Sequence, residues 1–420
     1  MDKDTKELAL HLLIQKQSDL HLTYELIERE TGYSKRQLIR LSSDLQEKDM
    51  ESIMTHGNAG RKPVTTASDQ EVSYLREMKK PYPLITVAQF RDIFIEDVIE
   101  NPKKKSEVKK YRLKPRSISW FRELFIKEGW TSPAQKAIRE EGSHVTHPIR
   151  KPRPCRGELV QIDGTPFDWF GDGRVYTLHL AVDDATTEVL AGWFMPTECT
   201  RGYCRMMRLI LEKYGVPEAL YSDRDSVFRS VKGGGITQYA MMMEDLHIQT
   251  IFALSAQSKG RIERYNGTAQ LRLPNDIKRF GINHDYNELN KWFNDFYIKY
   301  MNRKFAFTPL DPHDAFICLP KDFDYSEVFR IRETRRMSHN MFSYKTAMYS
   351  LFNSDGELMT FQDKTTVNIY TDVFTEELYA IRYGKRYSCM QVGENARDKS
   401  QKIENQKDLQ EFLNDYRRKK

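Results

Sequence analysis

The sequence contains no long apolar segment. None of its 420 residues belongs to an uninterrupted hydrophobic run of the roughly 18 residues that a membrane-spanning helix needs, and the mean hydropathy is −0.67. The N-terminal stretch is charged and amphipathic, unlike a secretory signal. These absences argue against a membrane protein and a secreted one, and we expect a cytoplasmic location with no membrane partner.

Cysteine is also scarce. The chain has five cysteines, an odd number, and no two of them form a CxxC pair. They are scattered along the chain as Cys155, Cys199, Cys204, Cys318 and Cys389. This pattern predicts neither a disulfide framework nor a zinc site, and a reducing compartment fits it best.

The chain has little excess charge of either sign, since 66 Lys and Arg against 60 Asp and Glu give a formal charge of +6. This excess is concentrated in one segment. Residues 101–156 carry 16 basic and 5 acidic side chains, a net charge of +11, whereas residues 1–100 carry 14 and 18, and residues 157–310 carry 18 and 19. A local charge of this size attracts phosphates, so nucleic acid is the favoured partner class. A basic solubilising linker is the alternative.

A helical head is predicted for residues 1–56. Leucines recur at helical spacing near the N-terminus, and residues 23–31 form a second helical pattern that Gly32 ends. Ser34 is a candidate N-cap for a third helix over residues 35–46. This order is typical of a helix-turn-helix DNA-binding domain, in which the second helix enters the major groove. Simple helix packing is the alternative. The candidate DNA-binding residues here are Lys35, Arg36, Gln37 and Arg40.

A second helical DNA-binding domain is predicted for residues 64–140, after a linker that contains glycine and proline. Apolar spacing predicts helices near 72–78 and 87–94, and Ser117 is the candidate cap of a third helix that follows a lysine-rich stretch. Residues 141–156 are expected to be an extended basic linker. The candidate DNA-binding residues in the first linker and this domain are Arg61, Lys62, Lys103, Lys104, Lys105, Lys109, Lys110 and Arg122.

From residue 157 the pattern changes to strands. Alternating apolar residues predict three strands in two successive hairpins, followed by a helix, a short strand, a helix, a strand and a long helix from about Arg261. This is the element order of a ribonuclease-H-like α/β fold, which we assign to residues 157–320 as the catalytic core. The fold class predicted for the chain is therefore multidomain: all-α helix-turn-helix modules, the α/β core, and a small β-barrel-like domain over residues 330–395. Residues 396–420 are a polar basic tail.

Three carboxylates are predicted to meet in the core. Asp163 lies inside the first strand among apolar neighbours, where an acid is costly to bury unless it binds something positive. Asp223 ends the fourth strand, at the edge where α/β sheets bind ligands, and Glu263 opens the long helix after a further 39 residues. The trio offers the oxygen ligands that Mg²⁺ or Mn²⁺ prefer. Two such ions about 3.5–4 Å apart promote in-line attack on a phosphodiester. An ordinary turn or cap role is the alternative for any single acid, and it is the favoured interpretation of Asp183 and Asp184.

Residues around Glu263 supply further candidates. Lys259 and Arg261 precede it and could hold the DNA backbone, and Asn266 lies one turn later on the same helix face. Solvated charges at a helix start are the alternative. His179, on an alternating strand, is better explained as a packed or an exposed strand histidine than as a ligand, and the run Met241–Met243 as helix core.

The blocks that contain the three acids also carry a resemblance. With QIDGTPFDWF, LYSDRDSVF and SAQSKGRIERYNGT, residues 157–320 resemble the catalytic core of DDE transposases of the retroviral-integrase superfamily. The last block and the helical head most resemble ISNCY-type bacterial insertion-sequence transposases. The resemblance implies that Asp163, Asp223 and Glu263 coordinate two Mg²⁺ or Mn²⁺ ions. The separation of Asp223 and Glu263 is a few residues longer than is usual in integrases.

The resemblance implies the function of a DNA transposase. Such an enzyme binds terminal inverted repeats, cleaves at the element ends and joins the 3′-hydroxyls to target DNA by two-metal-ion transesterification. Its partners would be double-stranded DNA and further copies of the chain, in a dimer or larger synaptic complex, and it would associate with the bacterial nucleoid when bound to DNA. The alternatives are a ribonuclease-H-like nuclease that never joins DNA and a DNA-binding regulator with an inactive core.

Overall fold

The structure, a computed structural model, describes residues 3–19, 21–54, 66–133, 151–222, 236–252 and 260–394, together with residues 414 and 418. The chain divides into two units, residues 1–78 with 105–113 and residues 79–104 with 114–420. Over the described ranges, no helix combines the length and the apolar composition that crossing a membrane requires.

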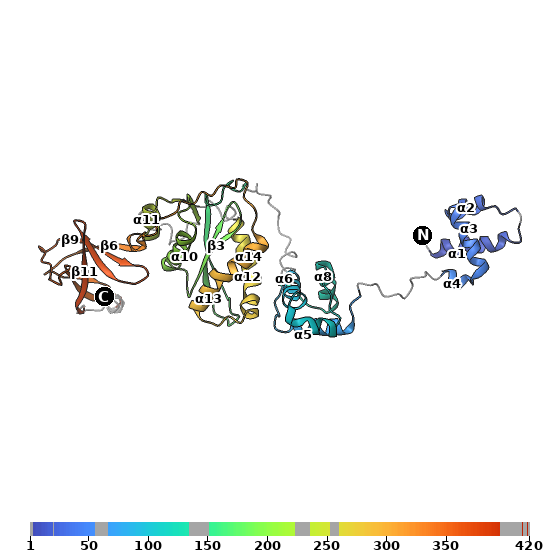
Figure 1. The fold of residues 1–420 in the computed structure, drawn as a ribbon, viewed down its shortest axis with the longest axis horizontal. Helices are drawn as coiled ribbons and strands as arrows, with labels where there is room; N and C mark the ends of the chain where they lie inside the picture. The colour runs from blue at the N-terminus through green and yellow to red at the C-terminus, as the bar shows by residue number, and fades with distance from the viewer. Residues whose placement is uncertain are drawn as a thin grey trace. The chain divides into compact units, whose positions relative to one another are not determined.

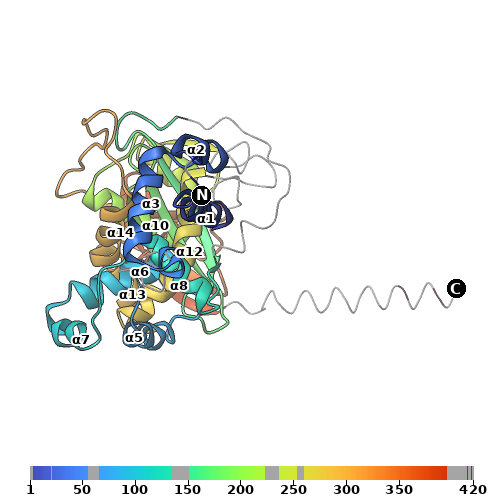
Figure 2. The same ribbon diagram turned by 90° about the vertical axis from the view of Figure 1, so that its right-hand side faces the viewer.

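Short helices build the first unit. They are α1 (Lys3–Lys16), α2 (Tyr24–Thr31), α3 (Lys35–Glu47), α4 (Met50–Met54), α5 (Asp69–Lys79, its last residue beyond the unit) and α7 (Lys105–Lys110). The first three helices pack together (Figures 1 and 2), and their shared core consists of Ala9, Leu13, Ile27, Tyr33 and Leu38. The helical head predicted from leucine spacing is therefore confirmed.

The connection between α2 and α3 contains the predicted signals. Gly32 ends α2 with a φ of 71°, a conformation that glycine adopts without strain. Ser34 then caps α3 in a capping box: its hydroxyl accepts from the Gln37 N–H, and the Gln37 side-chain oxygen accepts from the Ser34 N–H at 2.9 Å. The helices and their turn agree with the sequence, whereas DNA binding by this helix pair remains a prediction.

The helical part of the second unit surrounds an aromatic cluster. Its elements are α6 (Val87–Phe94), the π-helical turn η1 (Ile95–Ile99), the 3₁₀ turn η2 (Pro102–Lys104) and α8 (Ile118–Lys127). Ser117 caps α8 as predicted, by accepting from the Trp120 N–H. The rings of Phe90, Phe94, Phe121, Phe125 and Trp130 meet edge to face between α6 and α8.

A five-stranded mixed sheet of order β3-β2-β1-β4-β5 forms the core of the second unit. The strands β1 (Val160–Phe167), β2 (Tyr176–Asp183) and β3 (Val189–Met195) are antiparallel, and β4 (Ala219–Ser222) and β5 (Gln249–Phe252) run parallel to β1. The mixed α/β core predicted from the strand and helix order is confirmed, and β1 is its central strand.

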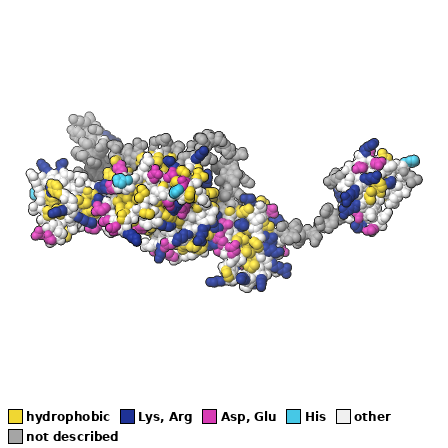
Figure 3. All heavy atoms as spheres, turned by 45° about the horizontal axis from the view of Figure 1, so that its top comes forward, with side chains coloured by type: hydrophobic (Ala, Val, Ile, Leu, Met, Phe, Trp, Pro, Cys, Tyr) yellow, Lys and Arg dark blue, Asp and Glu magenta, His cyan; other side chains and the backbone are white. Residues whose placement is uncertain are grey.

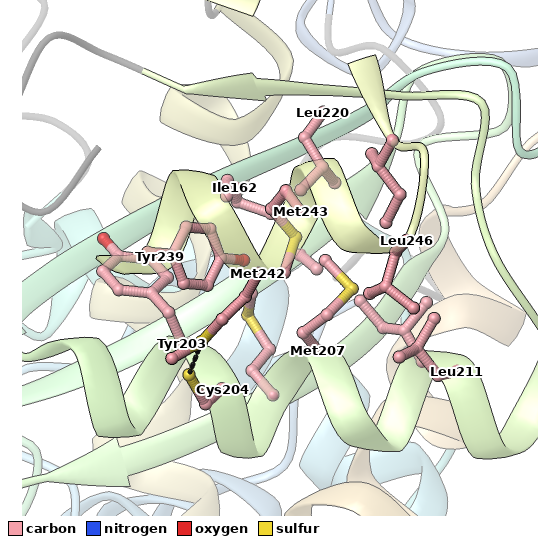
Figure 4. Close-up of a cluster of buried hydrophobic side chains, with 14 of the residues drawn as sticks. Ile162, Tyr203, Cys204, Met207, Leu211, Leu220, Tyr239, Met242, Met243 and Leu246 are labelled. Atoms are coloured by element: carbon pink, nitrogen blue, oxygen red, sulfur yellow. Dashed lines mark hydrogen bonds between the residues drawn. The ribbon is translucent and has the colours of Figure 1, made fainter. Parts of the chain in front are cut away.

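Helices cover both faces of this sheet (Figure 1). On one face lie α10 (Thr200–Lys213) and α11 (Gln238–Asp245), and on the other lie α12 (Gly260–Arg279), α13 (Tyr286–Trp292), the π-helical turn η4 (Phe293–Tyr297) and α14 (Ile298–Phe305). The α10 and α11 face is rich in methionine: Met207, Met242 and Met243 are fully buried beside Ile162 of β1 (Figure 4). Met242 and Met243 are therefore helix core, as expected.

A buried polar network joins the helical part of this unit to the core. It places three acids of α6 and η1 against three cations of α12 and α14. Asp92 pairs with Arg272, and Asp97 pairs with Arg279. Lys304 pairs with both Asp92 and Glu96. The side chains of Arg272 and Arg279 are 7% and 5% exposed. Since buried charges require partners, these contacts hold the two parts together.

The C-terminal part is a six-stranded sheet of order β6-β9-β10-β11-β8-β7, in which every described pairing is antiparallel. Its strands are β6 (Arg330–Arg336), β7 (Phe342–Tyr344), β8 (Ala347–Phe352), β9 (Thr366–Asp372), β10 (Leu378–Arg382) and β11 (Lys385–Glu394). The side chain of Gln238 in α11 exchanges two hydrogen bonds with the Arg332 backbone of β6. A β-rich domain is confirmed, and its closure into a barrel remains a prediction.

Candidate active site

Asp163 lies in the middle of β1, the central strand. Side chains alternate along a strand, so Ile162 faces α10 and α11, whereas Gln161 and Asp163 face α12. The Asp163 side chain is half-buried. The backbone of Asp163 is held in place because β1 has a neighbouring strand on each side: it pairs with β2 along its whole length and with β4 near its start.

The first turns of α12 lie against β1 and bring two further predicted residues to this site. Asn266 is 8% exposed, and its Nδ2 donates to Oδ2 of Asp163 at 2.8 Å. Glu263 is exposed and lies one helical turn before Asn266, on the same face of α12. The structure therefore brings Asn266 of α12 to Asp163 of β1, and Glu263 lies in the same first turns of α12, while its meeting with Asp163 remains a prediction.

Asp223, the remaining predicted ligand, lies outside the described residues. Its neighbour Ser222 is the last residue of β4, which runs parallel to β1 with Gln161 opposite Tyr221. Over the described residues, no three His, Cys, Asp or Glu side chains form a group that could hold a metal ion. The predicted trio is not complete within those residues, because Asp223 is not among them.

Two buried oxygen atoms beside Asp163 have no hydrogen-bond partner among the described residues. They are Oγ1 of Thr165, two residues along β1 on the same face, and Oδ1 of Asn266. Unpaired buried acceptors are rare in folded proteins and call for a partner such as water or an ion. Carboxylates with neighbouring neutral oxygens are the donor set that hard divalent cations prefer, so these residues fit the predicted Mg²⁺ or Mn²⁺.

Arg261, a predicted DNA contact, is engaged inside the protein. Its Nη1 lies 2.8 Å from Oδ1 of Asp184, and the two side chains are 16% and 0% exposed. Asp183 has the predicted turn role, since its carboxylate accepts from the N–H and hydroxyl of Thr186 and from the Gly157 N–H. Lys259 lies outside the described residues.

The other predicted DNA-binding residues are on helix surfaces. Lys35, Arg36, Gln37 and Arg40 are exposed on α3, although the Gln37 side chain also closes the capping box, and Arg122 is exposed on α8. Of the lysines, Lys104 is half-buried and Lys103, Lys105, Lys109 and Lys110 are exposed. Arg61 and Lys62 lie outside the described residues. On the face that Figure 3 presents, side chains of both charge signs are interspersed.

Sequence reasoning missed Gln161 and Thr165. Both face α12 from β1, two residues before and two residues after Asp163. Strand alternation alone places them beside Asp163, so the signal was present in the period-two pattern. The partner of Gln161 on α12, the Ile262 N–H, is 101 positions away in sequence, and this is why the contact was not predictable.

Comparisons with known proteins support the resemblance. No family model matches the chain. A protein of Sinorhizobium fredii named as a transposase, y4bF, is 37% identical over 191 residues, which are 44% of this chain and 41% of that protein. The transposase for insertion sequence IS1202 of Streptococcus pneumoniae is 28% identical over 300 residues, 66% of this chain and 63% of that protein. The chain thus spans less than two thirds of the length of either relative. The predicted resemblance to insertion-sequence transposases is confirmed.

Similar solved structures include retroviral integrases. The HTLV-2 integrase catalytic core in complex with magnesium matches with a TM-score of 0.27 and 19% identity, over 34% of this chain and 88% of that one. A chain of the simian T-cell lymphotropic virus intasome in complex with PP2A regulatory subunit B56 gamma matches with a TM-score of 0.31 and 15% identity, over 69% of this chain and 95% of that one. At these TM-scores, nothing further is inferred from them about this chain.

Proposed function

We propose that the chain is a DNA transposase that cleaves DNA at the ends of a mobile element and joins the freed 3′-hydroxyls to target DNA. The observation that carries the proposal is the hydrogen bond from Asn266 to Asp163, which sets the start of α12, with Glu263, against the central strand. The chain's similarity to the two transposases supports the same reaction class.

Asp163, Asp223 and Glu263 would hold the divalent cations, two Mg²⁺ or Mn²⁺ ions. Such ions, when bound, supply Lewis-acid activation of the attacking oxygen and charge stabilisation at the leaving oxygen. The trio provides three negative charges for this purpose. Asp223 follows β4 directly in the sequence, and a ligand at the carboxyl end of a strand is the usual arrangement in α/β sheets.

The remaining side chains at the site would orient the proposed metal ligands. Asn266 is a positioning residue, because its bond to Oδ2 restrains the Asp163 carboxylate. The Thr165 hydroxyl and the Asn266 side-chain oxygen are buried, and they have no hydrogen-bond partner among the described residues. Water or a DNA hydroxyl is the nucleophile, so no side chain forms a covalent bond with DNA.

The helical regions would recognise the element ends. Residues 1–56 present the exposed α3 cations, residues 64–140 present α8 and the lysine-rich stretch, and 141–156 would be a basic linker to the core at 157–320. The β-rich domain at 330–395 would contribute further contacts to DNA or protein. Paired ends imply a dimer or larger assembly of the chain.

A strand-transfer assay tests the proposal. The full chain, Mg²⁺ or Mn²⁺, and pre-cut terminal-repeat DNA should yield joined product, and Asp163→Asn should reduce its rate by about 10³-fold or more because a metal ligand and its charge are lost. Asp223→Asn and Glu263→Gln should behave alike, and all three variants should retain DNA binding. Cleavage without joining would favour a nuclease, and binding alone would favour a regulator. An Asp223→Asn variant that joins DNA normally would contradict the assignment of the trio.

A further inference from the structure

A fully buried acid, Asp184, connects three separate segments beside the proposed site. Its Oδ1 accepts from Nε2 of Gln161 in β1 at 2.7 Å and from Nη1 of Arg261 in α12 at 2.8 Å, and its Oδ2 accepts from the Arg153 N–H at 2.9 Å. The acid follows β2, in the turn that leads to β3. Burial of a carboxylate is costly unless it is paired and hydrogen-bonded. The buried Asp184 therefore holds β1, α12 and the segment that contains Arg153 in one arrangement.

Gln161 links this acid to the first turn of α12. Its Nε2 donates to Asp184, while its Oε1 accepts from the Ile262 backbone N–H at 3.2 Å. The first N–H groups of a helix have no partner within the helix and need one from outside. Gln161 therefore caps α12 from the neighbouring strand.

The position of these contacts in the sequence connects them to the proposed chemistry. Gln161 lies two residues before Asp163 on the same face of β1, and Arg261 lies two residues before Glu263 in the first turn of α12. We infer that Gln161, Asp184 and Arg261 together form a positioning assembly that sets Glu263 relative to Asp163. These three residues act through the two carboxylates and do not contact the reacting atoms.

This inference rests on the proposed function and assigns Arg261 a role other than the DNA contact expected from sequence. A guanidinium that is 16% exposed and paired with a buried acid has little surface left for a phosphate. The pair is also geometrically restrictive, because the planar guanidinium offers its donors in fixed directions. Lysine at the same position keeps the charge and loses that geometry.

The test measures Mn²⁺ binding to the full-length chain, by calorimetry and by electron paramagnetic resonance, for Asp184→Asn, Arg261→Lys and Gln161→Glu. The carboxylate that Gln161→Glu introduces would still accept from the Ile262 N–H but could no longer donate to Asp184. We expect each variant to bind Mn²⁺ about 10- to 100-fold more weakly, to turn over more slowly in strand transfer, and to keep the wild-type KM for DNA. The double variant Asp184→Asn with Arg261→Lys should lose no more Mn²⁺ affinity than the worse of its two single variants, since the residues act as one unit.

Arg156→Gln is the matched control. Arg156 pairs at 2.7 Å with Glu188, which follows the same turn as Asp184, and its side chain is 19% exposed. Its second ion-pair partner is Asp314, so both partners lie outside α12. Arg156→Gln should lose about as much thermal stability as the three test variants while keeping the wild-type Mn²⁺ affinity. A general loss of stability is thereby distinguished from a loss of positioning at the site.

Three results would overturn the inference. Unchanged Mn²⁺ affinity in all three variants of a metal-binding wild type would reject the positioning assembly alone. Weaker DNA binding with a shallower salt dependence in Arg261→Lys, at unchanged Mn²⁺ affinity, would return Arg261 to the role of a phosphate contact. A wild-type chain that binds no Mn²⁺ at all would reject the proposed function itself, and the inference with it.

Discussion

At the scale of single residues, His179 shows how burial decides between a structural and a catalytic role. The ring is fully buried; its Nδ1 lies 3.1 Å from the Trp193 carbonyl oxygen, and its Nε2 accepts from the Cys199 N–H at 3.2 Å. A carbonyl only accepts and an N–H only donates, so these partners fix the neutral tautomer with the proton on Nδ1. A Cβ on Gly202 would come within 2.3 Å of the ring. The packed role expected from the sequence is confirmed.

His179 should make the stability of the core depend on pH. Burial lowers its pKa from 6.5 to about 4, so the unfolded chain binds a proton below pH 6.5 and the folded chain does not. Stability should therefore fall as the pH drops through this window, by about 1.4 kcal/mol at pH 5.5 and by up to about 3 kcal/mol near pH 4. Denaturant unfolding of wild type and His179→Gln at pH 7.5, 5.5 and 4.5 measures the effect. The His179→Gln variant should be less stable than the wild type at pH 7.5 but should lose less stability on acidification.

The candidate site was partly predictable because its strongest signals are local. Asp163 inside an apolar strand, and Glu263 with Asn266 on one helix face, follow from the periodicity of two neighbouring elements. Asp184 was interpreted as a turn residue, and nothing local identifies Arg261 as its partner, because the two are 77 positions apart. Buried ion pairs of this kind depend on tertiary packing, which periodicity does not specify.

At the scale of elements, α12 shows the limit of local rules. The sequence predicts its start near Arg261, but Pro274 lies inside the 20-residue helix, and a proline normally ends or kinks one. Two carbonyl groups near Pro274 accept from side chains: the Leu271 carbonyl from Nδ2 of Asn275, and the Arg272 carbonyl from Nε2 of Gln89 in α6. The second donor is 183 positions away, so this contact between α12 and α6 is not predictable from the local sequence.

The start of α3 allows capping and DNA recognition to be separated. The Gln37 side chain completes the capping box with Ser34, and glutamate serves equally well at that position. Gln37→Glu should therefore keep the hydrogen-exchange protection of the α3 amides in the full chain, while Gln37→Ala should lower it by about 1 kcal/mol. If Gln37 lies at the DNA, Gln37→Glu should nevertheless weaken terminal-repeat binding by about 1–3 kcal/mol in fluorescence anisotropy. Unchanged DNA affinity in Gln37→Glu would leave this residue with capping alone.

At the scale of the whole molecule, the described parts of the second unit are joined by charge as well as by apolar packing. Arg279 of α12 pairs with both Glu96 and Asp97 of η1, and Arg201 of α10 pairs with Glu376, which precedes β10, at 2.6 Å. These partners are more than 170 positions apart in sequence. Element types were predictable here from periodicity, whereas the pairing of one segment with another depends on which charges, distant in sequence, meet in the fold.

The uneven distribution of charge along the chain leads to the last prediction. The core at 157–310 is nearly neutral, and the excess of +11 lies at 101–156. If this segment holds DNA, replacing five of its nine lysines by glutamine should weaken DNA binding. The slope of log affinity against log salt concentration should become shallower by about 0.9 for each phosphate that is no longer neutralised. The lysines are Lys103, Lys104, Lys105, Lys109 and Lys110.

Binding isotherms over a range of salt concentrations measure that effect, and a second variant controls for net charge. It replaces five exposed lysines elsewhere by glutamine, namely Lys278, Lys291, Lys299, Lys321 and Lys364. Both variants lose five positive charges, so a specific DNA-binding role predicts a large loss of DNA affinity only in the first. Both should keep the wild-type Mn²⁺ affinity, because neither set of lysines includes a proposed metal ligand. Equal losses in the two variants would show that net charge alone matters, and unchanged affinity in the first would exclude these five lysines as DNA contacts.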